Sequence, residues 1–387
     1  MAQEEIDRRV WSKIPEVILE QVLRHLPLSA MLRFQSVCKH WKLFLNSVEF
    51  RNSYAHTTAE ESYIVFVPIH VQQLTLCPLY NPFVNKWRHV DLAYLQCTLK
   101  GLGCLRIKEI SSASGLQCLC AGSATNKDEV YVVSNPLTRE CRVLPSLKGK
   151  LALRGLAIEV DKDFGCYKVF AIISQLYREF EMHVYESSTK AWQFLFRLPQ
   201  TCPFCVSSVL FNGTYYSLQM HDLVLLQHDF AQNAWAASAV TLAEIGKSMK
   251  LLVSTGRLFH VSIVDKRIPV ETPGNFSRVL DISVFELKVL SGECEQIEAF
   301  TTPYNGRGYF WDAVGYTNSL ILLLQFPHDH VKGSSKTMMR NNSVEFGFLN
   351  LQEEPKNLEN FTLNGLFGED GSQKLLDSLT FDLHAKV

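Results

Sequence analysis

The chain has 387 residues, which is enough for one small and one large domain. A hydrophobic content of 47% and an aromatic content of 11% can supply a sizeable core. The formal net charge of -1 lacks the basic footprint of nucleic-acid-binding domains, so we expect no nucleic-acid partner.

The eleven cysteines are an odd number spread along the chain, and the segment from Met1 to Glu5 is acidic, unlike a secretory signal peptide. Both features favour reduced thiols, and we expect the protein in the cytoplasm, the nucleus or both. No apolar run approaches the roughly 18 residues that cross a bilayer. The run from Ser319 to Leu324 has the length of a strand. We therefore expect no membrane partner.

Residues 11–50 have helical spacing. Pro15 and Glu16 favour a helix start, because proline fits the first turn and the helix dipole favours an acidic side chain there. The aliphatic residues that follow lie on one helical stripe: Ile18, Leu19, Val22, Leu23 and Leu26. Pro27 is expected to end this helix.

Two further short helices are expected after Pro27. Ser29 can cap the second, and the third is predicted over residues 39–45. We interpret Val37, Cys38 and Trp41 as residues that stabilise the trio itself rather than dock a partner.

From Tyr63 onward the pattern changes to short runs rich in β-branched and aromatic residues. Turn residues separate these runs, and no helical segment is expected between them. The clearest runs are residues 63–67, 130–133, 167–173 and 206–216. The pattern excludes a fold of alternating strands and helices.

One hairpin signature recurs, in which a strand ends in a short polar turn and a second strand, often with an aromatic residue, follows. Its copies are residues 80–87, 134–141, 185–192 and 228–235, with a weaker copy at 285–293. The period of about 40–55 residues matches one four-stranded propeller blade, and roughly 320 residues at that period make six or seven blades. A β-sandwich is the alternative, but sandwich strands rarely repeat one hairpin so regularly. In a propeller, Trp87, Trp192 and Trp235 are expected to pack between blades.

Candidate catalytic and metal sites are weak. Cys202 and Cys205 have the spacing of a redox motif, but a strand is predicted after them, where a thiol-activating helix would be needed. The run His328–Asp329–His330 reads as a solvated loop after a strand. We expect no catalytic residues, no metal and no cofactor.

Residues 11–50 resemble the F-box family. The matching stretches run from Trp11 to Leu28 and from Leu32 to Trp41, with an aliphatic helix ending in Leu-Pro and a Val-Cys-Lys-x-Trp close. Ile14 stands where leucine is usual. The remainder resembles plant F-box proteins with kelch or F-box-associated repeats, through the Asn-Pro turns at Asn81 and Asn135, residues 166–169 and 184–187, and the run 211–216. It departs from kelch blades in having no Gly-Gly pair.

The resemblance implies a flexible start at 1–10, an F-box of three helices at 11–50, a linker at 51–60 and an all-β, kelch-like propeller at 61–387. It also implies docking on a Skp-type adaptor, which links to a cullin and a RING protein. A module of about 40 residues has little core of its own, so a covering subunit is also expected on physical grounds. The candidate docking residues are Ile14, Pro15, Ile18, Leu19, Val22, Leu23, Leu26, Pro27 and Leu28.

The propeller loops are expected to capture a target protein for ubiquitination and degradation. The segment 304–311 combines aromatic residues, glycine and arginine, a composition common at interface hot spots. The candidate target-binding residues are Tyr304, Arg307, Trp311, Phe204 and Arg154.

We therefore expect a non-catalytic receptor subunit of a Skp–cullin–F-box ubiquitin ligase. One rival interpretation is a propeller enzyme or sugar-binding lectin with an F-box-like appendage. Another is an F-box co-regulator that acts outside the ligase.

Overall fold

The computed structural model describes two short helical stretches, most of the chain from 62 to 304, and several separate strands beyond it. The described residues are 15–26, 34, 37–45, 47, 50, 62–81, 86–123, 129–136, 138–147, 151–161, 166–175, 179–198, 205–219, 224–230, 232, 234–242, 248–254, 256–269, 276–304, 310–316, 319–326, 343–350, 361–362, 373–375 and 379–380. Within these ranges, no helix is both long and apolar enough to cross a membrane.

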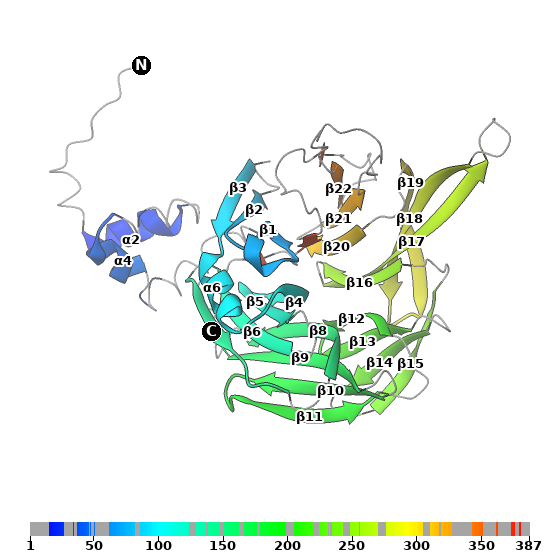
Figure 1. Cartoon of the computed structure of the whole chain (residues 1–387), viewed down its shortest axis with the longest axis horizontal. Helices are drawn as coiled ribbons and strands as arrows, with labels where there is room; N and C mark the ends of the chain where they lie inside the picture. Colours follow the sequence, from blue (N-terminus) through cyan, green and yellow to red (C-terminus); the bar gives the residue numbers. More distant parts are fainter. Residues whose placement is uncertain are drawn as a thin grey trace, which may run out of the picture.

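Two described α-helices lie in the N-terminal region, α2 (Glu16–Arg24) and α4 (Lys39–Leu45). Both lie beside the ring of sheets (Figure 1). The sequence predicted three helices here. Most of the residues between Ser29 and Val37 fall outside the described part of the chain, so the middle helix stays a prediction.

Five sheets of the propeller have four strands each, and every pairing within them is antiparallel between chain neighbours. The first two comprise β4 (Arg106–Ala113), β5 (Leu116–Gly122), β6 (Glu129–Asn135) and β7 (Glu140–Val143), then β8 (Leu151–Asp161), β9 (Cys166–Gln175), β10 (Glu179–Glu186) and β11 (Ala191–Arg197). The third comprises β12 (Cys205–Phe211), β13 (Thr214–Gln219), β14 (Val224–Asp229) and β15 (Ala234–Thr241).

The last two four-stranded blades follow the same order. One comprises β16 (Ser248–Ser254), β17 (Arg257–Pro269), β18 (Phe276–Lys288) and β19 (Glu293–Tyr304). The other comprises β20 (Phe310–Tyr316), β21 (Ser319–Phe326), β22 (Ser343–Asn350) and β23 (Phe361–Thr362). The blades are arranged radially (Figure 1).

The remaining sheet has five strands and joins the two ends of the propeller. Its strands are β1 (Ser62–Pro68), β2 (Leu76–Asn81), β3 (Lys86–Asp91), β24 (Gln373–Leu375) and β25 (Leu379–Thr380). Both β24 and β25 pair with β1, while β24 contacts β20 and β25 contacts β4. The C-terminal strands therefore connect the last blade, the first sheet and the first four-stranded blade.

This architecture corrects the predicted six or seven four-stranded blades. Among the described residues the propeller has five four-stranded blades, and its remaining sheet is a five-stranded one built from both ends of the propeller. The repeat period did not reveal this assembly, because β24 and β25 are short and pair with a strand about 300 residues away.

The region is also not all-β, because η1 (Val71–Gln73) and the helix α6 (Ala93–Gly101) interrupt the strands before β4. Leu95 and Leu99 of α6 are buried, and the Gln96 side-chain amide donates to the Gln72 carbonyl at 2.6 Å. The helix thereby covers the cluster between the five-stranded sheet and β4–β7.

Neighbouring blades pack through apolar clusters and are joined by hydrogen bonds from polar side chains. Glu129 on β6 accepts the backbone N–H of Leu153 on β8 at 3.1 Å, and also pairs with Lys108 at 2.9 Å. The Ser207 hydroxyl accepts the backbone N–H of Leu251 on β16 at 2.9 Å. These contacts fix the rotation of one blade against the next.

Candidate functional site

The helix α2 has an apolar arc that its own chain covers only in part. Leu23 is buried, and Leu19 and Leu26 are half-buried. All three belong to a cluster with Leu45 of α4, Phe50, and Tyr63 of β1. Because residues one turn apart share a helix face, Leu19 and Leu23 form the inner side of α2.

The other edge of this arc is exposed. Ile18 and Val22, also one turn apart, are 51% and 48% exposed, and Val17 is 67% exposed. Two exposed branched aliphatic side chains on one face of a short helix are typical of an interaction site. We call Ile18 and Val22 the α2 apolar edge.

The structure thus divides the predicted docking residues. Pro15, Ile18 and Val22 are exposed, whereas Leu19, Leu23 and Leu26 contribute to the internal cluster. The predicted residues Ile14, Pro27 and Leu28 lie outside the described residues.

The α4 region corrects one part of the sequence interpretation. Val37 is 66% exposed and Cys38 is also exposed, so neither is an interior residue. Trp41 does pack inside, stacked on Phe34 with ring centroids 5.0 Å apart. Val17 and Leu43 were not among the predicted docking residues, and Leu43 is 74% exposed. Both residues lie off the buried helical stripe, and this position is the feature of the sequence that could have identified them as exposed.

The predicted target-binding residues are not brought together. Arg154 is half-buried on β8, and its Nε donates to the Ser174 hydroxyl at 3.1 Å. The backbone register places Tyr304 on β19 opposite Arg278, and Trp311 on β20 opposite Leu324 of β21. Arg307 and Phe204 lie outside the described residues.

Two of the three tryptophans expected to pack between blades do so, and Trp87 does not. Trp192 on β11 contacts Tyr131 of the preceding blade, with ring centroids 5.3 Å apart. Trp235 on β15 contacts Phe196 of β11 edge-on at 5.2 Å. Trp87 packs within its own sheet against Tyr80 at 4.7 Å.

The cysteine and histidine motifs provide no site in the described part of the chain. Cys205 begins strand β12, as predicted, while Cys202 and the run 328–330 lie outside the described residues. Burial raises the pKa of the Cys118 and Cys120 thiols on β5 well above their ordinary value, which keeps them protonated. The described residues contain no cluster of three or more potential metal ligands.

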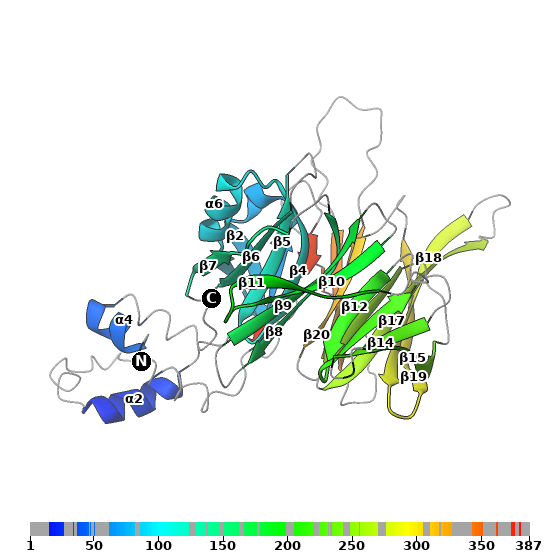
Figure 2. The same cartoon turned by 90° about the horizontal axis from the view of Figure 1, so that it is seen from below.

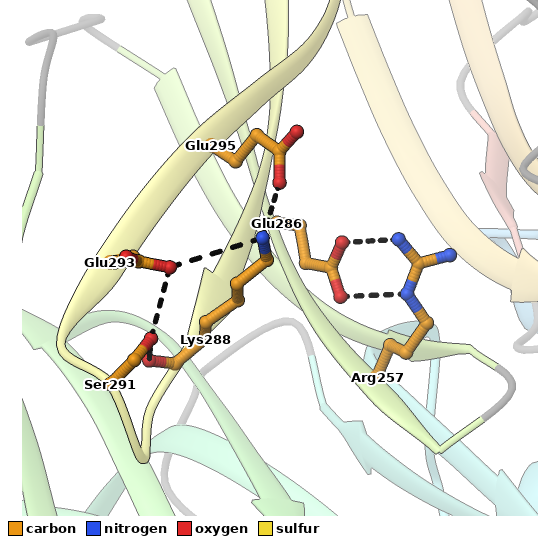
Figure 3. Close-up of polar contacts among 6 residues, drawn as sticks. All are labelled: Arg257, Glu286, Lys288, Ser291, Glu293 and Glu295. Atoms are coloured by element: carbon orange, nitrogen blue, oxygen red, sulfur yellow. Dashed lines mark hydrogen bonds and ion pairs between the residues drawn. The ribbon is translucent and has the colours of Figure 1, made fainter.

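The blade β16–β19 has a dense ionic network at one end. The Arg257 guanidinium forms a two-point ion pair with the Glu286 carboxylate, which raises the pKa of Arg257 and lowers that of Glu286 (Figure 3). Lys288 contacts Glu295 at 2.6 Å and Glu293 at 3.9 Å. The network joins β17, β18 and β19 and stiffens this end of the blade.

Comparison with known families gives two matches. Residues 11–53 match the F-box domain, and residues 96–255 match the F-box associated beta propeller domain. The first match includes α2 and α4, and the second runs from α6 to the β16 hairpin.

Curated relatives from Arabidopsis thaliana agree with these matches. F-box only protein 6 is 24% identical over 64% of this chain and 53% of its own length. An F-box/kelch-repeat protein is 26% identical over 60% of this chain and 56% of its own length. The chain thus spans little more than half of these relatives. The protein UNUSUAL FLORAL ORGANS is 22% identical over 67% of this chain and 62% of its own length.

Solved structures resemble the chain only distantly. TolB from Acinetobacter baumannii has a TM-score of 0.45 at 9% identity, covering 83% of this chain and 67% of that one. The SapL1 lectin has a TM-score of 0.41 at 9% identity, covering 78% and 96%. These likenesses are too weak to carry a functional argument.

F-box domains in general bind Skp-type adaptors. The chain therefore combines a match to the F-box domain with a match to the F-box associated β-propeller domain, and it is similar to F-box proteins of Arabidopsis thaliana.

Proposed function

We propose that this protein is the substrate-recognition subunit of a Skp–cullin–F-box ubiquitin ligase. The α2 apolar edge docks the Skp-type adaptor, and the propeller holds a target protein. Ubiquitin transfer then takes place on other subunits, and the receptor raises the local concentration of the target.

The observation that carries the proposal is the division of α2 into a covered and an exposed side. The N-terminal cluster reaches the propeller through Tyr63, yet Ile18 and Val22 remain about half exposed. Burying one such side chain stabilises an interface by roughly 1.5–3 kcal/mol, so a few of them support adaptor binding after association costs.

Calorimetric titration of the full chain with a purified Skp-type adaptor tests the docking. We expect Ile18→Glu and Val22→Glu each to weaken binding by at least about tenfold, because a carboxylate is then buried in an apolar contact. Val143→Glu is the matched control, since Val143 on β7 is similarly exposed at 42% but lies in the propeller. Unchanged affinity of both α2 variants would refute the docking assignment.

Target capture and cellular location are parts of the same proposal. We place the target on the propeller and the complex in the cytoplasm, the nucleus or both. Cross-linking in cells with wild-type protein and with the Ile18→Glu variant checks both parts. The variant should retain target cross-links while losing those to adaptor and cullin; loss of the target alone would contradict the arrangement.

A further inference from the structure

Strands β17 and β18 of the blade β16–β19 form the longest pairing among the described strands. Strands β17 and β18 have 13 residues each, whereas β13 and β14 have 6 each. Pairing of β16 with β17 ends at Ile263, but β17 and β18 stay paired to Pro269 and Phe276. The paired ends project beyond the ring in two perpendicular views (Figures 1 and 2). We call residues 264–269 and 276–281 the arm.

The arm exposes a strand edge. Beyond Ile263, β17 is the edge strand of its sheet within the described part of the chain, because β16 has ended while β18 continues on the other side. Six residues of strand span about 20 Å. An exposed edge of that length can accept an extended peptide as an added strand.

The two faces of the arm differ in charge balance. On one face, Lys266 contacts the Asp281 carboxylate at 2.5 Å, and the Thr301 hydroxyl also donates to Asp281. These contacts lower the pKa of Asp281, so this pair is charged and compensated. The face therefore has little remaining demand for a counter-ion.

The opposite face holds two arginines directly across from each other. Arg267 and Arg278 are register partners, so their side chains leave the sheet on the same face. Asp265 lies on that face, and its carboxylate is 3.8 Å from the Arg278 guanidinium. Arg267 is exposed and has no ion-pair or hydrogen-bond partner among the described residues. Two guanidinium groups thus lie on one face of the arm, with the Asp265 carboxylate beside Arg278.

Like charges directly opposite each other destabilise a strand pair, and an added carboxylate would relieve that repulsion. We propose that the arm binds an extended acidic segment of a protein partner, which adds along the β17 edge and places a carboxylate at Arg267 and Arg278. The inference deepens the proposed function by naming the chemistry of the target. It remains separable from that function, because adaptor binding takes place at α2.

Fluorescence anisotropy with the full chain tests the inference. The probe is a labelled synthetic peptide of alternating glutamate and valine, long enough to cover residues 264–269. Two further peptides separate the contributions: one with glutamine for each glutamate removes the charge, and one with proline for each valine cannot add as a strand. We expect the first peptide alone to bind well, and its affinity to fall with added salt.

Charge reversal locates the site. Arg267→Glu should lower the affinity for the glutamate–valine peptide by about tenfold. The double variant that also carries Arg278→Glu should lower this affinity further. Arg88→Glu on β3 is the control, because Arg88 is exposed, lies in another sheet, and changes the net charge equally. Arg267→Gln is the milder variant should the reversal unfold the arm, which circular dichroism will show.

Three results would overturn the inference: equal binding of the neutral peptide, no loss with either Arg267 variant, or an equal loss with Arg88→Glu. In those cases the arginines only protect the strand edge from aggregation. None of these results bears on the adaptor titration, so failure here leaves the receptor role standing.

Discussion

Trp192 on β11 donates its indole N–H to the carbonyl of Pro145, 2.7 Å away, and so connects one blade to the segment that follows β7. Trp235 occupies the corresponding hairpin position one blade later, but its indole nitrogen is buried with no hydrogen-bond partner among the described residues. The two tryptophans therefore differ in hydrogen bonding at similar aromatic packing.

Replacing each tryptophan with phenylalanine isolates that hydrogen bond. Both changes remove the same ring volume, but only Trp192→Phe leaves a carbonyl without its donor. We expect Trp192→Phe to destabilise the propeller by about 1 kcal/mol more than Trp235→Phe in urea unfolding. Equal losses would mean that the contact with Pro145 contributes nothing to stability.

The aromatic hairpins show what the sequence predicted well. Cross-strand pairing joins Tyr80 with Trp87, Tyr185 with Trp192, and His228 with Trp235, at the recurring signature. A local hairpin is specified by residues a few positions apart, so its pattern survives in the sequence. The run 319–324 likewise lies within the strand β21.

The features that sequence reasoning missed depend on distant contacts. Helix α6 has Leu95 and Leu99 at helical spacing, but the apolar residues that this face covers come from η1, the five-stranded sheet and β4–β6. On α2, the stripe marked both Ile18 and Leu23, and the positions of Leu45, Phe50 and Tyr63 decide which of them is covered. Periodicity identifies an apolar face without naming its partner.

Leu23 and Ile18 provide a test of that division. Leu23→Ala should destabilise the N-terminal cluster by roughly 2–5 kcal/mol, because it leaves a cavity among Leu45, Phe50 and Tyr63. Ile18→Ala should change stability by less than about 0.5 kcal/mol. Hydrogen exchange of the α2 amides measures both. Comparable loss of protection in the two variants would contradict the assignment of Ile18 to the exposed edge.

His260 on β17 should make stability depend on pH. Its ring is fully buried, stacked on Phe285 with centroids 5.8 Å apart, and neither ring nitrogen has a hydrogen-bond partner among the described residues. Burial lowers its pKa from 6.5 to about 4. Between these values the unfolded chain binds a proton that the folded chain does not, so the contribution is complete above pH 6.5 and is lost as pH falls toward 4.

The expected loss over that window is on the order of 3 kcal/mol. His260→Phe should reduce the slope of the unfolding free energy against pH by the amount that corresponds to about one bound proton. Urea unfolding at several pH values measures this slope. The control is His89→Phe on β3, because His89 is exposed. An unchanged slope in His260→Phe would show that the imidazole is protonated or solvated in the folded protein.

The C-terminal strands offer the last test, because they close the ring through β1 alone. β24 pairs with Phe66, Val67 and Pro68, and β25 pairs with Ser62 and Tyr63. Deleting residues 373–387 should leave the inner edge of β1 unpaired and expose side chains such as Phe66, which is fully buried.

We expect this deletion to abolish hydrogen-exchange protection in residues 62–68, where protection should otherwise approach that of the blades. Because Tyr63 also belongs to the N-terminal cluster, protection of α2 should fall as well. Deleting only residues 381–387 removes neither strand and is the matched control. If β1 keeps its hydrogen-exchange protection in the longer deletion, ring closure does not depend on β24 and β25. If α2 keeps its protection while β1 loses it, the N-terminal cluster holds the helices α2 and α4 without help from a closed ring.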